Sequence, residues 1–196
     1  MEFRTLSPKF TVSPQISVED VGTIAAQGFR AIICNRPDGE GADQPSFKEI
    51  AAAAKAAGIE ARYVPVQSGM VKDQDVEAFG AALEDVQRPV FAYCRTGTRS
   101  ATLWSFHEAM KRPIAEILTA TKAAGYDMNG VARRIANGGK TPTDTGDAHF
   151  QVVIVGAGAG GISVAASLKS RQVRRYVHLR RVCCHWSLPV SFGGSD

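Results

Sequence analysis

The segment from Cys94 to Ser100 combines a potential nucleophile with groups that bind anions. It reads Cys-Arg-Thr-Gly-Thr-Arg-Ser and follows an apolar stretch that is typical of a buried strand. Where such a strand runs through a glycine-containing loop into a helix, several backbone N–H groups can converge on one anion, helped by the helix dipole. The same field favours the thiolate of Cys94 over its thiol. The segment therefore predicts a catalytic cysteine in an anion-binding loop.

The other residues of this loop have expected roles of their own. Gly97 permits the tight backbone path, and Arg99 can hold two oxyanions in a bidentate manner. Ser100 follows directly and could hydrogen-bond to the sulfur. The expected catalytic residues are Cys94, Arg99 and Ser100, and the expected anion-binding residues are Arg95, Thr96, Gly97, Thr98 and Arg99.

The elements that must position this loop alternate along residues 1–137, the expected catalytic domain. Apolar runs typical of strands occupy residues 9–13, 29–34, 59–66 and 89–93. Patterns and caps typical of helices occupy residues 17–27, 47–57, 76–86, 100–110, 113–125 and 128–136. Helices that alternate with short apolar strands predict an α/β domain with a mainly parallel sheet flanked by helices.

A second unit is expected after a linker at residues 138–149. Residues 150–196 open with an apolar strand and then carry the G-x-G-x-x-G pattern of Gly156, Gly158 and Gly161, in the context that a dinucleotide-binding turn requires. The segment resembles the start of FAD/NAD(P)-dependent oxidoreductases, in which these glycines approach the cofactor pyrophosphate. No carboxylate stands about 20 residues further on to hold the ribose. We therefore expect an incomplete Rossmann βα start with a vestigial FAD or NAD(P) motif and a basic tail.

Composition and charge limit the expected partners. Of the 196 residues, 44% are hydrophobic and 21% are charged, which is ordinary for a globular domain. Residues 171–196 hold five arginines and one aspartate, which account for the net charge of +4 and leave the rest balanced. The sequence has no apolar run of roughly 20 residues, the length of a membrane span, and its N-terminus lacks the apolar core of a signal peptide. We expect a cytoplasmic protein with a small anionic substrate and neither a nucleic-acid nor a membrane partner.

The cysteines predict neither a disulfide framework nor a metal site. Cys34 and Cys94 are isolated, no C-x-x-C is present, and the run Cys183-Cys184-His185 has no fourth ligand. Cys34, at the end of an expected strand, is interpreted as a core residue, and His107 as a structural residue of the helix after the loop. We expect no metal and no cofactor in the catalytic domain.

Similarity to a known family is carried by residues 93–104, which read Tyr-Cys-Arg-Thr-Gly-Thr-Arg-Ser-Ala-Thr-Leu-Trp. They resemble the phosphatase-like family associated with beta-lactamase-hydrolase-like proteins. Residues 28–40 and 63–66 agree with this resemblance, which extends over roughly residues 1–112. It implies a fold like the dual-specificity phosphatases, with Cys94 as nucleophile and Arg99 as oxyanion binder. The implied reaction is hydrolysis of a phosphate ester through a thiophosphate intermediate.

The sequence departs from the phosphatase pattern at several points, and Tyr93 stands where a histidine usually precedes the cysteine. In phosphatases the arginine lies six residues after the cysteine, whereas Arg99 lies five after Cys94, as in rhodanese sulfurtransferases. The aspartate that serves as general acid is absent at residues 67–69, where Gln-Ser-Gly stands. Two alternatives therefore stay open. One is a rhodanese-like sulfurtransferase that carries a persulfide on Cys94 and is linked to sulfide or redox metabolism, and the other is a non-catalytic anion-binding domain.

Three aspartates could replace the missing acid. Asp73 is the first candidate, and Asp75 and Asp38 are the others. Each of them also suits a helix cap or a turn, because short carboxylates accept hydrogen bonds from nearby backbone N–H groups.

Overall fold

A computed structural model of the chain describes residues 1–143. The expected dinucleotide-binding segment, with Gly156, Gly158 and Gly161, lies outside the described residues, as does the second half of the expected linker. Residues 138–143, the described part of that linker, continue from the last helix, and Thr141 donates hydrogen bonds to the carboxylate of Asp73 from its backbone nitrogen (2.9 Å) and its hydroxyl (2.7 Å).

The described residues form one sheet of short strands. These are β1 (Arg4–Ser7), β2 (Phe10–Ser13), β3 (Ala31–Cys34), β4 (Glu60–Tyr63) and β5 (Val90–Tyr93). Their order across the sheet is β1-β2-β5-β3-β4. Strand β1 pairs antiparallel with β2, and all other neighbours are parallel. The prediction of a mainly parallel α/β sheet is confirmed. Strand β1 was not predicted, because Leu6 is its single fully buried residue and the run carries little apolar signal.

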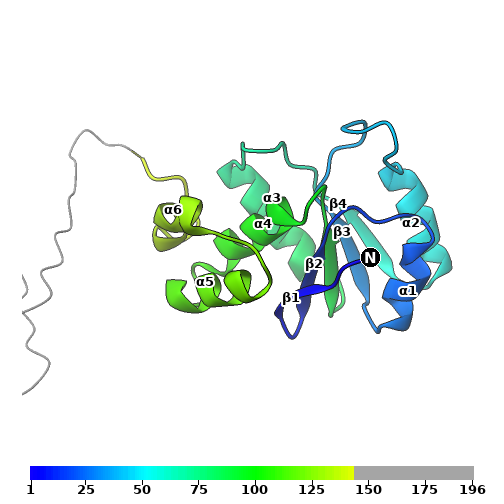
Figure 1. The fold of residues 1–196 in the computed structure, drawn as a ribbon, viewed down its shortest axis with the longest axis horizontal. Coiled ribbons are helices and arrows are strands. Elements are labelled where there is room, and N and C mark those ends of the chain that lie inside the picture. The colour runs from blue at the N-terminus through cyan, green and yellow to red at the C-terminus, as the bar shows by residue number, and fades with distance from the viewer. Residues whose placement is uncertain (144–196) are drawn as a thin grey trace, which may run out of the picture. The chain divides into compact units, whose positions relative to one another are not determined.

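Helices cover both faces of this sheet (Figure 1). One face carries α1 (Asp20–Ala26) and α2 (Phe47–Ala56), and the other carries α3 (Asp73–Glu84) and α4 (Thr98–Glu108). Beyond α4 lie α5 (Ile114–Ala123), a 3-10 turn (Asn129–Val131) and α6 (Ala132–Ala136). Among the described residues, no helix combines the length and the apolar character that crossing a bilayer would need.

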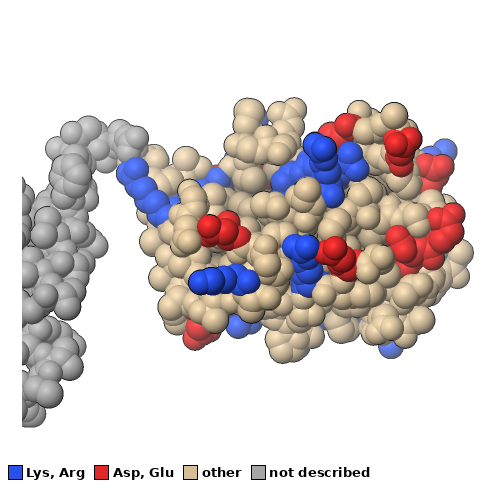
Figure 2. Space-filling model, in the orientation of Figure 1, with Lys and Arg blue, Asp and Glu red and all other residues tan. Residues whose placement is uncertain are grey.

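Charged side chains of both signs are interspersed over the face of the molecule seen in Figure 2. Acidic side chains gather over the end that carries α1 and α2, and basic side chains lie in separate groups. Within the described residues, this face therefore presents no continuous basic surface.

Alternation along the central strand divides the core into two layers. Successive side chains of a strand point to opposite faces of its sheet. Val90 and Ala92 of β5 belong to the core beneath α3 and α4, whereas Phe91 and Tyr93 belong to the core beneath α1 and α2. Cys34 is buried in this second core, which confirms its interpretation as a core residue.

Local capping explains where two of the helices begin. Ser46 and Glu49 form a capping box as predicted, since each side chain accepts a hydrogen bond from the other residue's backbone nitrogen. Helix α3 begins at Asp73 and not at the predicted residue 76. The carboxylate of Asp75 accepts a 2.7 Å hydrogen bond from the backbone nitrogen of Lys72, which places the cap one turn earlier.

The carboxyl ends of three strands meet at one edge of the sheet. Tyr93, the last residue of β5, lies in register with Ser13 of β2 on one side and with Cys34 of β3 on the other. The loops that follow these strands therefore start close together. In open α/β sheets this edge is where ligands bind.

Candidate active site

The Cys94 loop joins β5 to α4 at this edge. Cys94 directly follows Tyr93, its side chain is buried, and α4 begins at Thr98, two residues before the predicted start. Gly97 is the N-cap of α4, and its backbone N–H donates a 3.1 Å hydrogen bond to the sulfur of Cys94. The sulfur thus lies at the positive end of the helix dipole.

Gly97 is required at its position for two reasons. Its φ of +85° lies in the left-handed region, which side chains disfavour, and a Cβ there would overlap the hydroxyl of Tyr126. That hydroxyl donates a 3.3 Å hydrogen bond to the carbonyl of Thr96. The backbone nitrogen of Gln15 also donates to the carbonyl of Arg95 (3.3 Å). The loop is therefore held by hydrogen bonds from two distant segments of the chain.

Arg99 is buried on the first turn of α4 and is held by Glu40. Its Nη1 and Nη2 donate to the two carboxylate oxygens of Glu40, each at 2.7 Å. Nη1 also donates to the carbonyl of Val66 at 2.7 Å. A guanidinium has five N–H groups, so the Nε–H and one Nη2–H are left along one edge of the fork. That edge can grip two oxygens of an oxyanion.

The charges of this pair support each other. Hydrogen bonding from Arg99 holds the pKa of Glu40 below its ordinary value, although partial burial opposes the shift, and Arg36 adds a second ion pair at 3.1 Å. Burial works against the charge of Arg99, but its hydrogen bonds to Glu40 and the attraction of Cys94 leave its pKa raised. Arg99 is thus a permanent cation that interacts with both Cys94 and Glu40.

Ser100 is fully buried one residue after Arg99. Among the described residues, its hydroxyl has no hydrogen-bond partner, and the hydrogen bond to the sulfur of Cys94 comes from Gly97. The role expected for Ser100 stays a prediction.

The three candidate acids are each engaged by the backbone or by a cation. Asp73 accepts hydrogen bonds from Arg134 (2.7 Å) and from Thr141, and the bonds from Thr141 hold its pKa below the ordinary value. Asp75 caps α3, and Asp38 accepts a 2.9 Å hydrogen bond from the backbone nitrogen of Phe47. Asp75 and Asp38 thus have the capping roles that their residue type suggested, whereas Asp73 bridges Arg134 and Thr141.

A pocket of about 610 Å³ opens beside the loop. Arg95 lies exposed at its rim, and Glu40, already bound to Arg99, is the carboxylate in its lining. Its lining comprises Glu40, Ser68, Gly69, Val71, Arg95, Thr96, Thr98, Arg99, Thr102, Phe106, Val131 and Arg134. In the described part of the chain, no group of three or more His, Cys, Asp or Glu side chains could hold a metal ion.

Three residues of the site were missed from the sequence. Glu40 stands at the end of the stretch 28–40, so its place after a strand at the carboxyl edge was a usable signal. Tyr126 and Arg134 belong to the segment after α4, and nothing in their local sequence links them to the loop. Arg134 lies over the ring of Phe106 at 4.2 Å and donates to the carbonyls of Val71 and Gly139.

The fold and the loop together define a phosphatase-like α/β domain. Residues 2–111 match the family model described as the phosphatase-like domain of beta-lactamase hydrolase-like protein. The chain therefore belongs to this family, as the resemblance predicted.

Curated relatives carry the same family name. The chain is 34% identical over 130 residues to the beta-lactamase hydrolase-like protein of Agrobacterium fabrum strain C58, which covers 65% of this chain and 30% of that protein. It is 32% identical over 132 residues to the protein of that name from Xylella fastidiosa strain Temecula1, again over 65% and 30%. The chain thus matches less than a third of the length of these relatives.

Solved structures agree with the fold. A putative phosphatase from Neisseria meningitidis Z2491 superimposes with a TM-score of 0.64 at 36% identity, over 70% of this chain and 99% of that one. Tk-PTP in its active form superimposes with a TM-score of 0.53 at 15% identity, over 69% and 93% of the two chains. The second likeness shows the shared fold alone.

Proposed function

We propose that this domain hydrolyses a small phosphate ester through a thiophosphate intermediate on Cys94. The observation that carries the proposal is the position of the sulfur, which accepts the Gly97 N–H at the start of α4 and interacts with Arg99. The free edge of the Arg99 fork and the N–H groups of the loop would stabilise the negative charge that develops on the phosphoryl oxygens. The Neisseria relative, described as a putative phosphatase, supports the same reaction class.

The reaction would take two steps. The thiolate of Cys94 attacks phosphorus, a P–S bond forms, and the P–O bond to the leaving group breaks with its electrons on the departing oxygen. Water then attacks phosphorus, the P–S bond breaks, and phosphate leaves with the thiolate restored. Arg99 contributes by holding two oxygens in both steps. The proposed chemistry needs no cofactor in this domain.

A sulfurtransferase is the second candidate, and one observation favours it. Among the described residues, the pocket lining holds no uncommitted carboxylate that could act as a general acid, since Glu40 is bound to Arg99, and sulfur transfer needs no such acid. Here the thiolate of Cys94 would break the S–S bond of thiosulfate, forming a persulfide and releasing sulfite. A nucleophile such as cyanide would then take the outer sulfur as thiocyanate.

One pair of assays tests both candidates. The full chain and its Cys94→Ser variant are compared on 4-nitrophenyl phosphate and on thiosulfate with cyanide. Phosphate release that is lost in Cys94→Ser supports the phosphatase. Thiocyanate formation without phosphate release would overturn it in favour of the sulfurtransferase. Phosphate or sulfate binding without turnover of either donor would leave a non-catalytic anion-binding domain.

A further inference from the structure

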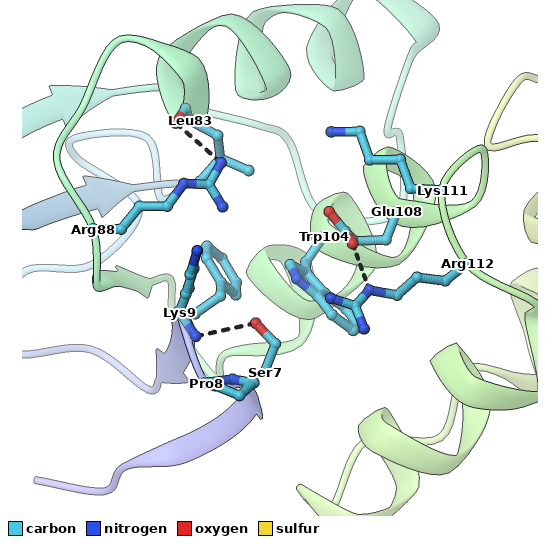
Figure 3. Close-up of a pocket in the computed structure, with 10 residues that line it drawn as sticks. Ser7, Pro8, Lys9, Leu83, Arg88, Trp104, Glu108, Lys111 and Arg112 are labelled. Atoms are coloured by element: carbon cyan, nitrogen blue, oxygen red, sulfur yellow. Dashed lines mark hydrogen bonds and ion pairs between the residues drawn. The ribbon is translucent and has the colours of Figure 1, made fainter.

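A second pocket lies at the opposite end of α4 from the Cys94 loop. It has a volume of about 390 Å³ and is formed where β2 and β5 begin and α4 ends (Figure 3). Helix α4 has 11 residues, so its two ends are about 16 Å apart. Among the residues described, none lines both pockets. The second pocket is therefore separate from the candidate active site.

Four basic side chains from three parts of the chain line this pocket. Lys9 stands before β2, Arg88 stands before β5, and Lys111 and Arg112 follow α4. The negative end of the helix dipole accounts for the two cations that follow α4. It does not account for Lys9 and Arg88, which belong to other elements.

These cations are poorly neutralised by the protein. Glu108 is the carboxylate in the lining, and it pairs with Arg112 at 2.6 Å. In the described part of the chain, Lys9, Arg88 and Lys111 have no carboxylate within ion-pair distance. Arg88 donates a long hydrogen bond to the carbonyl of Leu83 (3.4 Å), and the Nζ of Lys111 lies 2.8 Å from Nε2 of His107.

His107 does not supply the missing negative charge. Burial, and next to it the charge of Lys111, lower the pKa of His107, so the imidazole is neutral near pH 7 and can accept a hydrogen bond from the ammonium. Glu84 and Glu108 oppose this shift without reversing it. An imidazole that accepts from Lys111 orients the ammonium and leaves its charge uncompensated.

The floor of the pocket indicates the kind of anion that fits. Phe10 and Trp104 stack on each other with ring centroids 6.3 Å apart, and both are buried. Because Trp104 is buried, its ring offers no exposed face on which a base could stack. The pocket combines a short apolar floor with cations on both sides, a shape suited to a compact anion with several charges.

We propose that this pocket binds a diphosphate group, either as inorganic pyrophosphate or as the phosphate chain of a nucleotide. Two linked phosphates present oxygens on both sides at once, so one can face Lys9 and Arg88 while the other faces Lys111, since Arg112 is already paired with Glu108. A single phosphate has fewer oxygens to share between the two sides. The site is independent of Cys94 chemistry and stands even if the domain proves to be a sulfurtransferase.

Calorimetry with inorganic pyrophosphate at low salt, combined with amide chemical-shift mapping, tests this on the full chain. The variant Lys9→Gln/Lys111→Gln removes two exposed charges of the pocket. The control Lys55→Gln/Lys122→Gln removes two exposed charges away from both pockets.

Wild type and control should bind pyrophosphate with equal affinity, with chemical-shift changes at the amides of residues 9, 88 and 111. The pocket variant should bind about tenfold more weakly, which is about 1.4 kcal/mol, since two surface ion pairs to the bound anion are lost. Its unchanged Cys94-dependent activity would show that the fold is intact.

Several outcomes would overturn the proposal. They are shifts confined to residues 94–99, equal binding by the pocket variant and the control, no binding at all, or phosphate or citrate binding as tightly as pyrophosphate. ADP serves to distinguish the two sources of the group. Equal affinity for ADP and pyrophosphate means that the phosphate chain alone is recognised, whereas tighter binding of ADP identifies a nucleotide.

Discussion

Arg99 interacts with the nucleophile on one side and with a carboxylate on the other. Glu40 takes the Nη1/Nη2 end of the guanidinium, and the carbonyl of Val66 takes a further Nη1 hydrogen. The orientation of the free Nε/Nη2 edge toward the substrate therefore depends on Glu40. We regard Glu40 as a positioning residue, because its carboxylate acts through the arginine.

Glu40→Gln should weaken both activity and stability. An amide has one acceptor oxygen where the carboxylate has two, so the bidentate pairing with the guanidinium is lost and a buried cation loses its ionic partner. We expect kcat to fall, and urea unfolding at pH 7 to show a loss of about 1–3 kcal/mol, toward the lower end because the Glu40 side chain is 26% exposed. Asp43→Asn, an exposed residue of the same loop, is the matched control and should change neither.

The pH dependence of this loss follows from the lowered pKa of Glu40, whose ordinary value is 4.5. A carboxylate with a depressed folded-state pKa stabilises the fold above its unfolded-state pKa, and this contribution is lost as pH falls through the folded value. The difference in unfolding free energy between wild type and Glu40→Gln should stay constant from pH 7 to about 4.5 and shrink below it. A difference that is unchanged at pH 3 would contradict the ionic role of Glu40.

The engagement of the aspartates by other groups predicts a strong dependence on the leaving group. A general acid contributes roughly 100- to 10,000-fold, mostly for poor leaving groups. Without one, kcat/KM should drop by about 100-fold or more from 4-nitrophenyl phosphate to phenyl phosphate. Asp73→Asn should leave the ratio of the values for the two substrates as it is in wild type, because Asp73 is bound to Arg134 and Thr141. A marked change of this ratio in Asp73→Asn would show that Asp73 acts as the general acid.

At the scale of elements, the arrangement of residues that are consecutive in the sequence was predictable, whereas contacts between residues far apart in the sequence were not. The Cys94 loop carries its nucleophile, glycine and arginine within six positions, so strand, turn and helix dipole could be argued from local sequence alone. Glu40 lies 59 residues from Arg99 and meets it because β3 and β5 are neighbours in the sheet. Strand order depends on how the helices pack, and no local pattern encodes it.

Gly97→Ala tests how tightly the loop is held between its neighbours. The substitution adds the strain of a positive φ and the overlap with Tyr126, so we expect loss of Cys94-dependent turnover and destabilisation by more than about 1–2 kcal/mol. Gly58→Ala is the matched control, since Gly58 has a φ of +72° and a Cβ at that position would meet no atom within 4 Å. The loss of unfolding free energy in Gly58→Ala therefore measures the cost of the positive φ alone. Equal destabilisation by the two substitutions, measured by thermal melts, would contradict the close approach of Tyr126.

At the scale of the whole molecule, the catalytic unit is larger than the region matched by the family. The match ends at residue 111, yet Ile117, Tyr126 and Ile135 lie in the same core as β5 and α4. Val131 and Arg134 line the pocket beside the loop. The alternating pattern set the expected domain at residues 1–137, which stays a prediction, and the resemblance covered roughly residues 1–112.

A chain that ends at residue 111 should therefore lose the cooperative fold and the activity that a chain ending at residue 143 retains. Removing residues 112–143 exposes the apolar side of α4 and takes away the Tyr126 brace, and burying such surface contributes about 25 cal/mol per Å². We expect the 1–143 chain to melt cooperatively and to match the full chain in Cys94-dependent turnover. The 1–111 chain should lose both the sharp melt and the activity. Full turnover by the 1–111 chain would mean that α5, α6 and the wall they form are dispensable for the site.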